Sequence, residues 1–172
     1  MDINCPNLIQ IGREAFLNSG IKNVLNLGSI HQMDNTFYGC NIDTAIIPES
    51  VTEYLGAFNR GSVTKLTINE ENLIRLQHGL PLDAIGKDVI NLKNVTASNG
   101  GALFNGGCTQ VYLPKATLTS GITWFFTLDP KNPFHAQLVY FRDLSAVAWG
   151  DSMFRSCTIQ RVVINNTTVI PV

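Results

Sequence analysis

Charged side chains are scarce in this sequence, and they do not gather in any one place. They make up 15% of the 172 residues, and 12 basic against 13 acidic side chains leave a formal net charge of −1. A protein that binds nucleic acid normally carries a basic stripe or patch. We therefore expect no nucleic-acid partner.

Long apolar runs are missing as well. No stretch of about 18 apolar residues occurs, so we expect no insertion into a membrane. The N-terminal residues Met1 to Cys5 are not a basic segment followed by an apolar one, so they do not have the form of a secretory signal peptide. Export stays open, because a leader can be removed. The hydrophobic content of 45% indicates a packed chain rather than a disordered one.

Metal ligands with the usual close spacing are also lacking. The four cysteines are dispersed without a C-x-x-C pair, and the three histidines are far apart, so we predict no metal site. Cys40 and Cys157 each lie three residues after a recurring phenylalanine. Equivalent positions in distant repeats cannot meet, so we expect buried thiols that act as small hydrophobic residues.

Catalytic and cofactor motifs do not stand out. Gly100-Gly101 and Gly106-Gly107 surround Phe104, but the lysine of a phosphate-binding loop does not follow, so tight turns explain them better. The carboxylates are scattered and form no acid–base pair. Cys108 with His135 stays open as a nucleophile pair, although the place of Cys108 after a recurring phenylalanine favours a structural thiol. We expect no cofactor and no enzyme.

What the sequence does contain is a short phrase that returns along the chain. Ile11-Gly12-Arg13-Glu14-Ala15-Phe16 recurs at residues 149–154 and, more loosely, at 99–104. Phe16, Phe37 and Phe58 are evenly spaced, and apolar residues follow them at fixed offsets. A repeat of this kind, with a period of about 21 residues, is the signature of a solenoid, whose units bury their apolar sides against their neighbours. We predict that Gly12 makes the turn and that the phenylalanines stack in the core.

The offsets indicate a short strand in each repeat. Positions eight and ten residues after the phenylalanine, written +8 and +10, form a period-two pair with one buried face. An apolar residue also stands at +5. In the repeats that begin at Phe16, Phe37, Phe58 and Phe154, the residues at +5, +8 and +10 are, in that order, Ile21, Val24 and Asn26; Ile42, Ala45 and Ile47; Val63, Leu66 and Ile68; and Ile159, Val162 and Ile164. Turn formers such as Pro48-Glu49-Ser50 end the strand. A second apolar group, exemplified by Ile30 and Met33, predicts another inward side of each coil.

We predict one domain over residues 1–172, with about eight coils. The repeats are regular over 8–76, degenerate over 77–148 and regular again over 149–164. In the degenerate part, Ile90 takes the place of the phenylalanine. The aromatic run 124–126 is interpreted as core or as a second, exposed contact surface.

Leu8-x-x-Ile11-Gly12-x-x-Ala15-Phe16, Phe37-Tyr38-Gly39-Cys40-Asn41-Ile42 and Ala45-Ile46-Ile47-Pro48 resemble BspA-type leucine-rich repeats. The resemblance covers about two thirds of the chain. It implies a β-rich, curved solenoid with short parallel strands on one face and turns and short helical pieces on the other. It also implies a non-enzymatic adhesion protein at a bacterial or protist cell surface or outside the cell.

The candidate binding face consists of the residues that alternate with the buried strand positions. If +8 and +10 point inward, +7 and +9 point outward and line up between coils. The +7 row is Asn23, Thr44, Lys65, Gln110 and Arg161, and the +9 row is Leu25, Ile46, Thr67, Tyr112 and Val163. A solvated face without a partner is an equally good interpretation.

Three functions follow from these observations. The leading hypothesis is an interaction module that binds a protein or a surface glycan through the sheet face. A structural component of a virion, fibre or cell surface is the alternative. A cysteine-dependent hydrolase is the third. Solenoid ends need covering, and neither end has an obvious polar cap, so we expect either end to be continued by another domain, by another chain or by self-association with a second copy.

Overall fold

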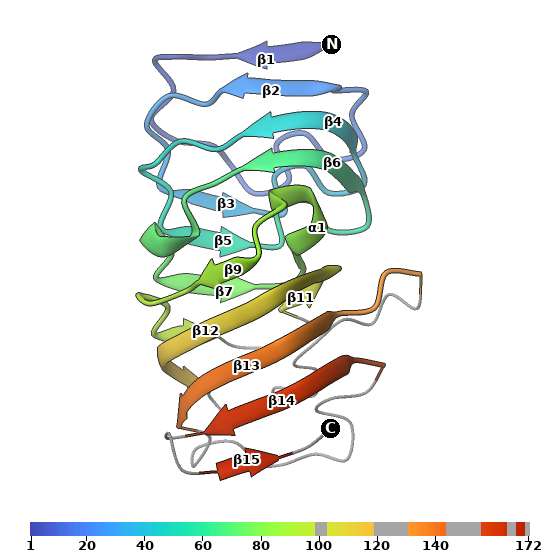
Figure 1. The fold of residues 1–172 in the computed structure, drawn as a ribbon. Coiled ribbons are helices and arrows are strands. Elements are labelled where there is room, and N and C mark those ends of the chain that lie inside the picture. The colour runs from blue at the N-terminus through green and yellow to red at the C-terminus, as the bar shows by residue number, and fades with distance from the viewer. Residues whose placement is uncertain (99–102, 119–130, 144–155, 165–167, 171–172) are drawn as a thin grey trace.

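Short strands separated by turns stack on one another along the whole chain (Figure 1). The computed structural model describes residues 1–98, 103–118, 131–143, 156–164 and 168–170. The strands are mostly parallel and form a β-solenoid of about six turns. The predicted β-rich solenoid is therefore confirmed, with fewer turns than the eight expected. The units in the C-terminal half are longer, since the separation between the paired residues Gln110 and Leu138 exceeds the regular period.

One side of the solenoid, here called the front face, carries the longer strands. The first four form a parallel sheet in the order β1 (Asp2–Asn4), β2 (Asn23–Asn26), β4 (Asn41–Ile46) and β6 (Ser62–Thr67). Below them lie β9 (Val89–Asn91), β12 (Gly107–Leu118), β13 (His135–Asp143) and β14 (Thr158–Ile164), also parallel. β15 (Thr168–Ile170) pairs antiparallel with β14.

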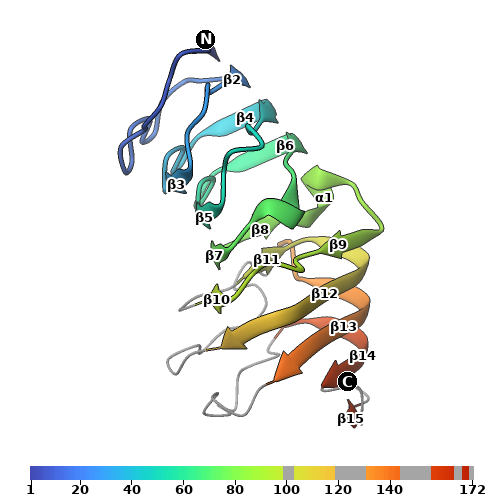
Figure 2. The same ribbon diagram turned by 90° about the vertical axis from the view of Figure 1, so that its left-hand side faces the viewer.

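The opposite side, the back face, also carries strands (Figure 2). They are β3 (Gln32–Asp34), β5 (Glu53–Leu55), β7 (Arg75–Gln77) and β10 (Ala97–Ser98). β12 joins the two faces, since it pairs with β9 near its start and with β10 near its end. A two-stranded pair of β8 (Leu80–Pro81) and β11 (Phe104–Asn105) lies at the corner between them.

Helical structure is confined in the described residues to a 3-10 turn, η1 (Glu70–Asn72), and one turn of α-helix, α1 (Leu82–Ile85). The sequence placed turns and short helical pieces on the face opposite the strands, whereas that face consists mainly of short strands. Neither helical element in the described part of the chain has the length or apolar character needed to cross a membrane.

The period of the sequence is visible in the strand register. Asn41 pairs with Ser62, and Gln32 pairs with Glu53, so each residue faces its equivalent in the next coil. At the +8 position, Val24, Ala45 and Leu66 are all buried. Ile30 and Met33 are completely buried, which confirms the second inward side. Parallel strands in the same register bring equivalent residues of successive coils into contact, so one repeat supplies the packing surface of the next.

Stacked aromatic rings form one corner of the core. The ring centroids of Phe16 and Phe37 are 5.4 Å apart, and those of Phe37 and Phe58 are 5.6 Å apart, with nearly parallel planes. Further along the chain, Phe104 and Phe134 continue the pattern at 5.4 Å in a tilted arrangement. Ring pairs at this spacing add to the hydrophobic gain from burial. The predicted phenylalanine stack is therefore confirmed.

At this corner, the chain reverses direction at the residues two before and two after each phenylalanine. Gly56 and Gly39 occupy such positions and have φ values of 73° and 71°. Glu14 and Asn18, around Phe16, have φ values of 56° and 53°. Only a left-handed residue reverses the chain so tightly, and such a residue is strained unless it is glycine. Gly12 has no positive φ, but its backbone oxygen accepts a hydrogen bond of 3.3 Å from the N–H of Ala15, so it begins the turn that leads to Phe16.

Ile90 was assigned to the wrong place in the repeat. It pairs with Val111 in the front face and is completely buried there, like the residues at the +8 position. The corner position belongs instead to Leu80, which pairs with Phe104. His78, two residues before Leu80, has a φ of 52°, in agreement with the other corners. Substitution of phenylalanine by leucine hid this unit from the sequence pattern.

The front face is interrupted once, between β6 and β9. α1 follows β8 and packs against β6 and β12, so it lies between the last strand of the upper ladder and β9 (Figure 1). Lys87, just after this helix, forms an ion pair of 2.6 Å with Glu70, whose side chain is only 3% exposed. Among the described strands, β9 pairs with β12 and β6 with β4. The front face is therefore two successive ladders.

The cysteines divide by environment. Cys40 is completely buried, and its thiol lies 2.9 Å from the backbone oxygen of Phe16. Cys108 and Cys157 are half-buried. The expected burial is therefore found for Cys40 and only in part for Cys157, whereas Cys5 is exposed. Cys5 precedes the first recurring phenylalanine and therefore has no equivalent place in the repeat.

Removing the middle ring of the corner stack tests its contribution to stability. Phe37→Ala leaves a cavity between two rings in a fully buried site, so we expect the free energy of unfolding in urea to fall by about 3–5 kcal/mol. Phe16→Ala is the matched control: Phe16 is half-buried and stacks on one described ring, and we expect a loss of about 1–2 kcal/mol. Equal losses would contradict a stack that depends on rings on both sides.

Candidate functional site

The longer front strands turn two consecutive residues outward. In β4, Ile42 and Ala45 are buried, as is Ile47 just after it, while Asp43 and Ile46 are exposed and Thr44 is half-buried. The three-residue gap between +5 and +8 bends the strand away from strict alternation. Three rows of side chains therefore face outward, at +6, +7 and +9. The sequence predicted the +7 and +9 rows and missed the +6 row.

The structure divides the predicted rows into two patches. Asn23 is paired with Thr44, and Thr44 with Lys65, on the N-terminal ladder. Ile46 and Leu25 lie beside them and are 42% and 43% exposed. Thr67 pairs with Ile46. This N-terminal patch is mainly aliphatic and polar.

The second patch lies on β12, β13 and β14. Gln110 and Arg161 are brought together through Leu138, which pairs with both. Tyr112 and Val163 are likewise joined through Tyr140. The interruption at α1 separates this C-terminal patch from the N-terminal one, so the two predicted rows are not continuous.

Leu138 and Tyr140 are not among the predicted binding residues, because the phenylalanine-based template does not cover the unit that contains them. Residues 137–141 lie in β13, but no phenylalanine precedes them at the distance that the template requires, so the template sets no register for this strand. Aligning Val139 with Val111, both buried, would have placed Tyr140 beside Tyr112. The alternation around Val139 is therefore the signal that could have found the pair.

The two tyrosines form an aromatic pair on the outside of the solenoid. The ring centroids of Tyr112 and Tyr140 are 4.8 Å apart, with an angle of 35° between the planes. Tyr112 is 40% exposed. Their spacing equals the distance between neighbouring strands, because the two residues are directly paired in the parallel ladder. At this distance the two rings face each other in a tilted stack, so the outward apolar surface of the pair is mainly the exposed part of Tyr112.

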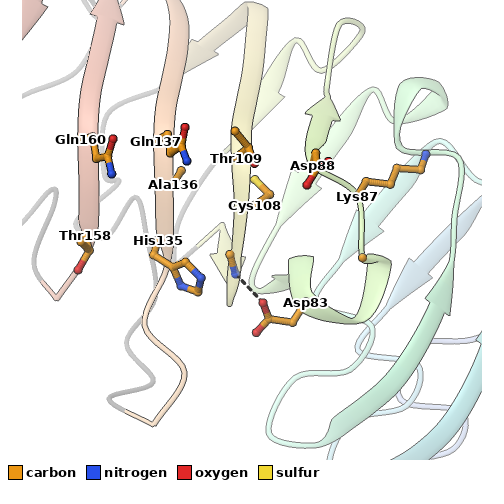
Figure 3. Close-up of a pocket in the computed structure, with 12 residues that line it drawn as sticks. Asp83, Lys87, Asp88, Cys108, Thr109, His135, Ala136, Gln137, Thr158 and Gln160 are labelled. Atoms are coloured by element: carbon orange, nitrogen blue, oxygen red, sulfur yellow. Dashed lines mark hydrogen bonds between the residues drawn. The ribbon is translucent and has the colours of Figure 1, made fainter.

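Two hollows lie next to this pair. The smaller has a volume of about 330 Å³ and is lined by Gln110, Gln137, Leu138, Gln160 and Arg161. The larger has a volume of about 560 Å³ and lies between the α1–β9 loop and the starts of β12, β13 and β14 (Figure 3). Gln137 and Gln160 line both, so the hollows are neighbours. Together with the tyrosine pair they make up the candidate site.

Hydrogen bonds and a close contact shape the larger hollow. The carboxylate of Asp83 on α1 accepts a hydrogen bond of 2.9 Å from the backbone N–H of Gly107 (Figure 3). A Cβ atom on Gly107 would lie 2.0 Å from Nε2 of His135, so only glycine lets that ring cross the start of β12. His135 Nδ1 is 3.3 Å from the backbone oxygen of Pro133. The floor of the hollow is therefore fixed by α1 and two neighbouring strands.

Cys108 lies in this hollow beside His135, the two residues that the sequence offered as a nucleophile and its base. Gly107 pairs with His135 and Cys108 with Ala136, which places Cys108 one step along the strand from the histidine. The thiol donates to the backbone oxygen of Gln110 at 3.3 Å. Burial, assisted by the charges of Asp83 and Asp88, raises the pKa of Cys108 to about 12. A thiol in this state is not an activated nucleophile.

Groups of three or more His, Cys, Asp or Glu side chains able to hold a metal ion do not occur in the described part of the chain. Several interpretations from the sequence lie outside the described residues. These are Gly100-Gly101, the aromatic run 124–126 and the phrase at 149–154.

Comparisons with protein-family models, with curated proteins and with solved structures found no match. The resemblance to BspA-type repeats therefore depends on the residues of this chain alone.

Thiol reactivity checks the environment of Cys108. With its pKa raised from 9.0 to about 12, the thiolate population near neutral pH falls roughly a thousandfold, so iodoacetamide at pH 8 should modify exposed Cys5 long before Cys108. Peptide mass spectrometry over time measures both sites, and Cys108→Ala should leave the fast reaction unchanged. Rapid alkylation of Cys108 in the folded protein would restore the nucleophile hypothesis.

Proposed function

We propose that this protein is a non-enzymatic binding module that contacts a protein or a surface glycan through its front face. One observation carries the proposal: a pair of tyrosines, exposed Tyr112 and half-buried Tyr140, lies beside Gln110 and Arg161 on three neighbouring strands. Tyrosine and arginine are the residue types that contribute most to binding energy at interfaces. The C-terminal patch is therefore the centre of the binding surface.

Rigidity supports the same proposal. The strands of the C-terminal patch are in register over several residues, and their inward residues Val111, Val139 and Val162 are buried. Side chains held by a packed sheet lose little conformational entropy on binding, which favours affinity. The resemblance to BspA-type leucine-rich repeats agrees with an adhesive role at a cell surface or outside the cell. The raised pKa of Cys108 speaks against the hydrolase hypothesis.

Substitutions on the two patches test where binding takes place. Tyr112→Ala combined with Arg161→Ala should raise the Kd at least about tenfold, because both side chains leave the centre of the surface. The matched control, Leu25→Ala with Lys65→Ala on the N-terminal patch, should change it less than about twofold. Biosensor measurements against purified extracellular proteins and immobilised glycans give the Kd, and circular dichroism verifies the fold. Equal binding by both variants would assign the contact to another surface.

A structural assembly component is the second candidate. Among the described strands, β1 is the outer strand of the N-terminal ladder, and Met1 and Ile9 in this first coil are 71% and 79% exposed. An open strand edge beside apolar side chains favours pairing with another chain. We propose that a second copy could cover this end.

Sedimentation velocity tests the assembly hypothesis. If the end is an assembly surface, the weight-average mass should rise between about 1 and 100 µM, a range in which micromolar association becomes visible. Ile9→Lys should then suppress the rise, because it places a charge on the exposed first coil. A constant monomer mass over the whole range would contradict this candidate.

A further inference from the structure

We infer that the ligand of the C-terminal patch is an uncharged oligosaccharide, bound along the strands with one sugar ring on Tyr112 and Tyr140 and the next over the adjoining hollows. The inference rests on the proposed function, because it assigns a ligand class to the same surface. Aromatic stacking, neutral hydrogen-bonding groups, local charge and dimensions each support it.

The tyrosine pair provides the stacking surface. The two rings are 4.8 Å apart, and Tyr112 is 40% exposed on the outer side of β12. The apolar C–H face of a sugar ring packs on the exposed part of Tyr112, since an aromatic ring combines a large apolar area with an electron-rich face. The rings pack against each other across two strands, so their orientation is set before the ligand arrives.

Amide side chains supply the hydrogen bonds. Gln110, Gln137 and Gln160 line the smaller hollow together with Arg161. Each amide offers two N–H donors and a carbonyl acceptor, which matches sugar hydroxyl groups that donate and accept at once. Thr109 and Thr158 add hydroxyl groups in the larger hollow. Three neighbouring strands thus present uncharged polar groups beside one aromatic surface.

The charges around the hollows leave a small acidic excess. Asp83 and Asp88 are the carboxylates that line the larger hollow, and Lys87 lines it as well. Lys87 is paired with Glu70, so Arg161 in the smaller hollow balances one of the two carboxylates. A small acidic excess gives a polyanion no electrostatic advantage. An uncharged oligosaccharide fits this surface better than an acidic one.

The dimensions fit linked rings rather than one isolated sugar. Tyr112 lies three residues beyond Thr109 on β12, which corresponds to about 10 Å at roughly 3.3 Å per residue. Two linked sugar rings extend over a similar length. The ligand would therefore reach from the aromatic pair to the hollow beside α1 without leaving the three strands.

A protein partner fits the patch less well. The centre of a protein interface is normally apolar and poor in groups that need hydrogen bonds. Here the two tyrosines adjoin Gln137 and Gln160, both exposed, and the neighbouring Leu138 is half-buried in its own sheet. The exposed aliphatic side chains Leu25 and Ile46 lie instead on the N-terminal patch.

Titration calorimetry with defined oligosaccharides tests the inference. The probes are cellohexaose, maltohexaose, mannohexaose and chitohexaose, with a galacturonic acid hexamer as the acidic comparison, each up to about 5 mM, a range that reveals millimolar binding. We expect at least one neutral hexamer to bind and the acidic hexamer to bind at least about tenfold more weakly. A matching dimer should retain measurable binding, because two rings span the site.

Variants connect the binding to the patch. Tyr112→Ala and Tyr140→Ala should each weaken the neutral hexamer at least about tenfold, whereas Tyr112→Phe should keep its affinity within about threefold, because the ring remains. Gln137→Ala should weaken binding about threefold to tenfold. Ile46→Ala on the N-terminal patch is the control and should have no effect. Tyr112→Phe conserves the packing of the ring, so it is the folded reference against which loss of binding through misfolding is recognised.

The outcomes separate this inference from the proposed function. If none of the neutral hexamers binds at the highest concentration, or if Tyr112→Ala and Tyr140→Ala leave their affinity unchanged, the oligosaccharide inference is overturned. If a protein partner is lost on Tyr112→Ala with Arg161→Ala and is not displaced by any hexamer, the binding module stands and its ligand is a protein. If the acidic hexamer binds more tightly than the neutral ones, the assignment to an uncharged ligand is wrong.

Discussion

Contact between equivalent residues of successive coils is the interaction on which this structure depends. One unit of the repeat has two apolar sides and cannot bury either by itself, so each coil is stable only when its neighbours cover it. The rings of Phe16, Phe37 and Phe58 make this dependence visible, since each ring is part of the surface on which the next one packs. The left-handed residues on both sides of these rings reverse the chain so that the next strand starts in register.

The same stacking explains how an outer surface can carry a binding site. The inward residues fix the position and direction of each strand, and the outward residues between them are not needed for packing of the core. Tyr112 and Tyr140 lie 4.8 Å apart because Val111 and Val139 beside them occupy the same level of the core. A site made in this way needs no loop to order on binding, which lowers the entropic cost of association.

The regular repeat is interrupted between β6 and β9, and the outer surface changes there. After Leu80, α1 replaces the usual corner, and the ion pair of Lys87 with buried Glu70 fixes the loop that leads to β9. This insertion ends the N-terminal ladder and makes one wall of the larger hollow, to which Asp83 contributes. An irregularity in the core pattern has therefore contributed to a concave surface on the front face.

The sequence by itself determined the solenoid, its period, its stacked phenylalanines and the outward direction of residues such as Tyr112 and Arg161. Those features follow from local spacing, because an apolar residue at a fixed offset implies the same buried place in every coil. Only the tertiary structure decided which strands are neighbours in the irregular units. Leu80 replaces a phenylalanine and residues 119–134 separate β12 from β13, so the regular offset does not place Tyr140 beside Tyr112. That pairing depends on strand register, which is set by the packing of Val139 on Val111 in three dimensions.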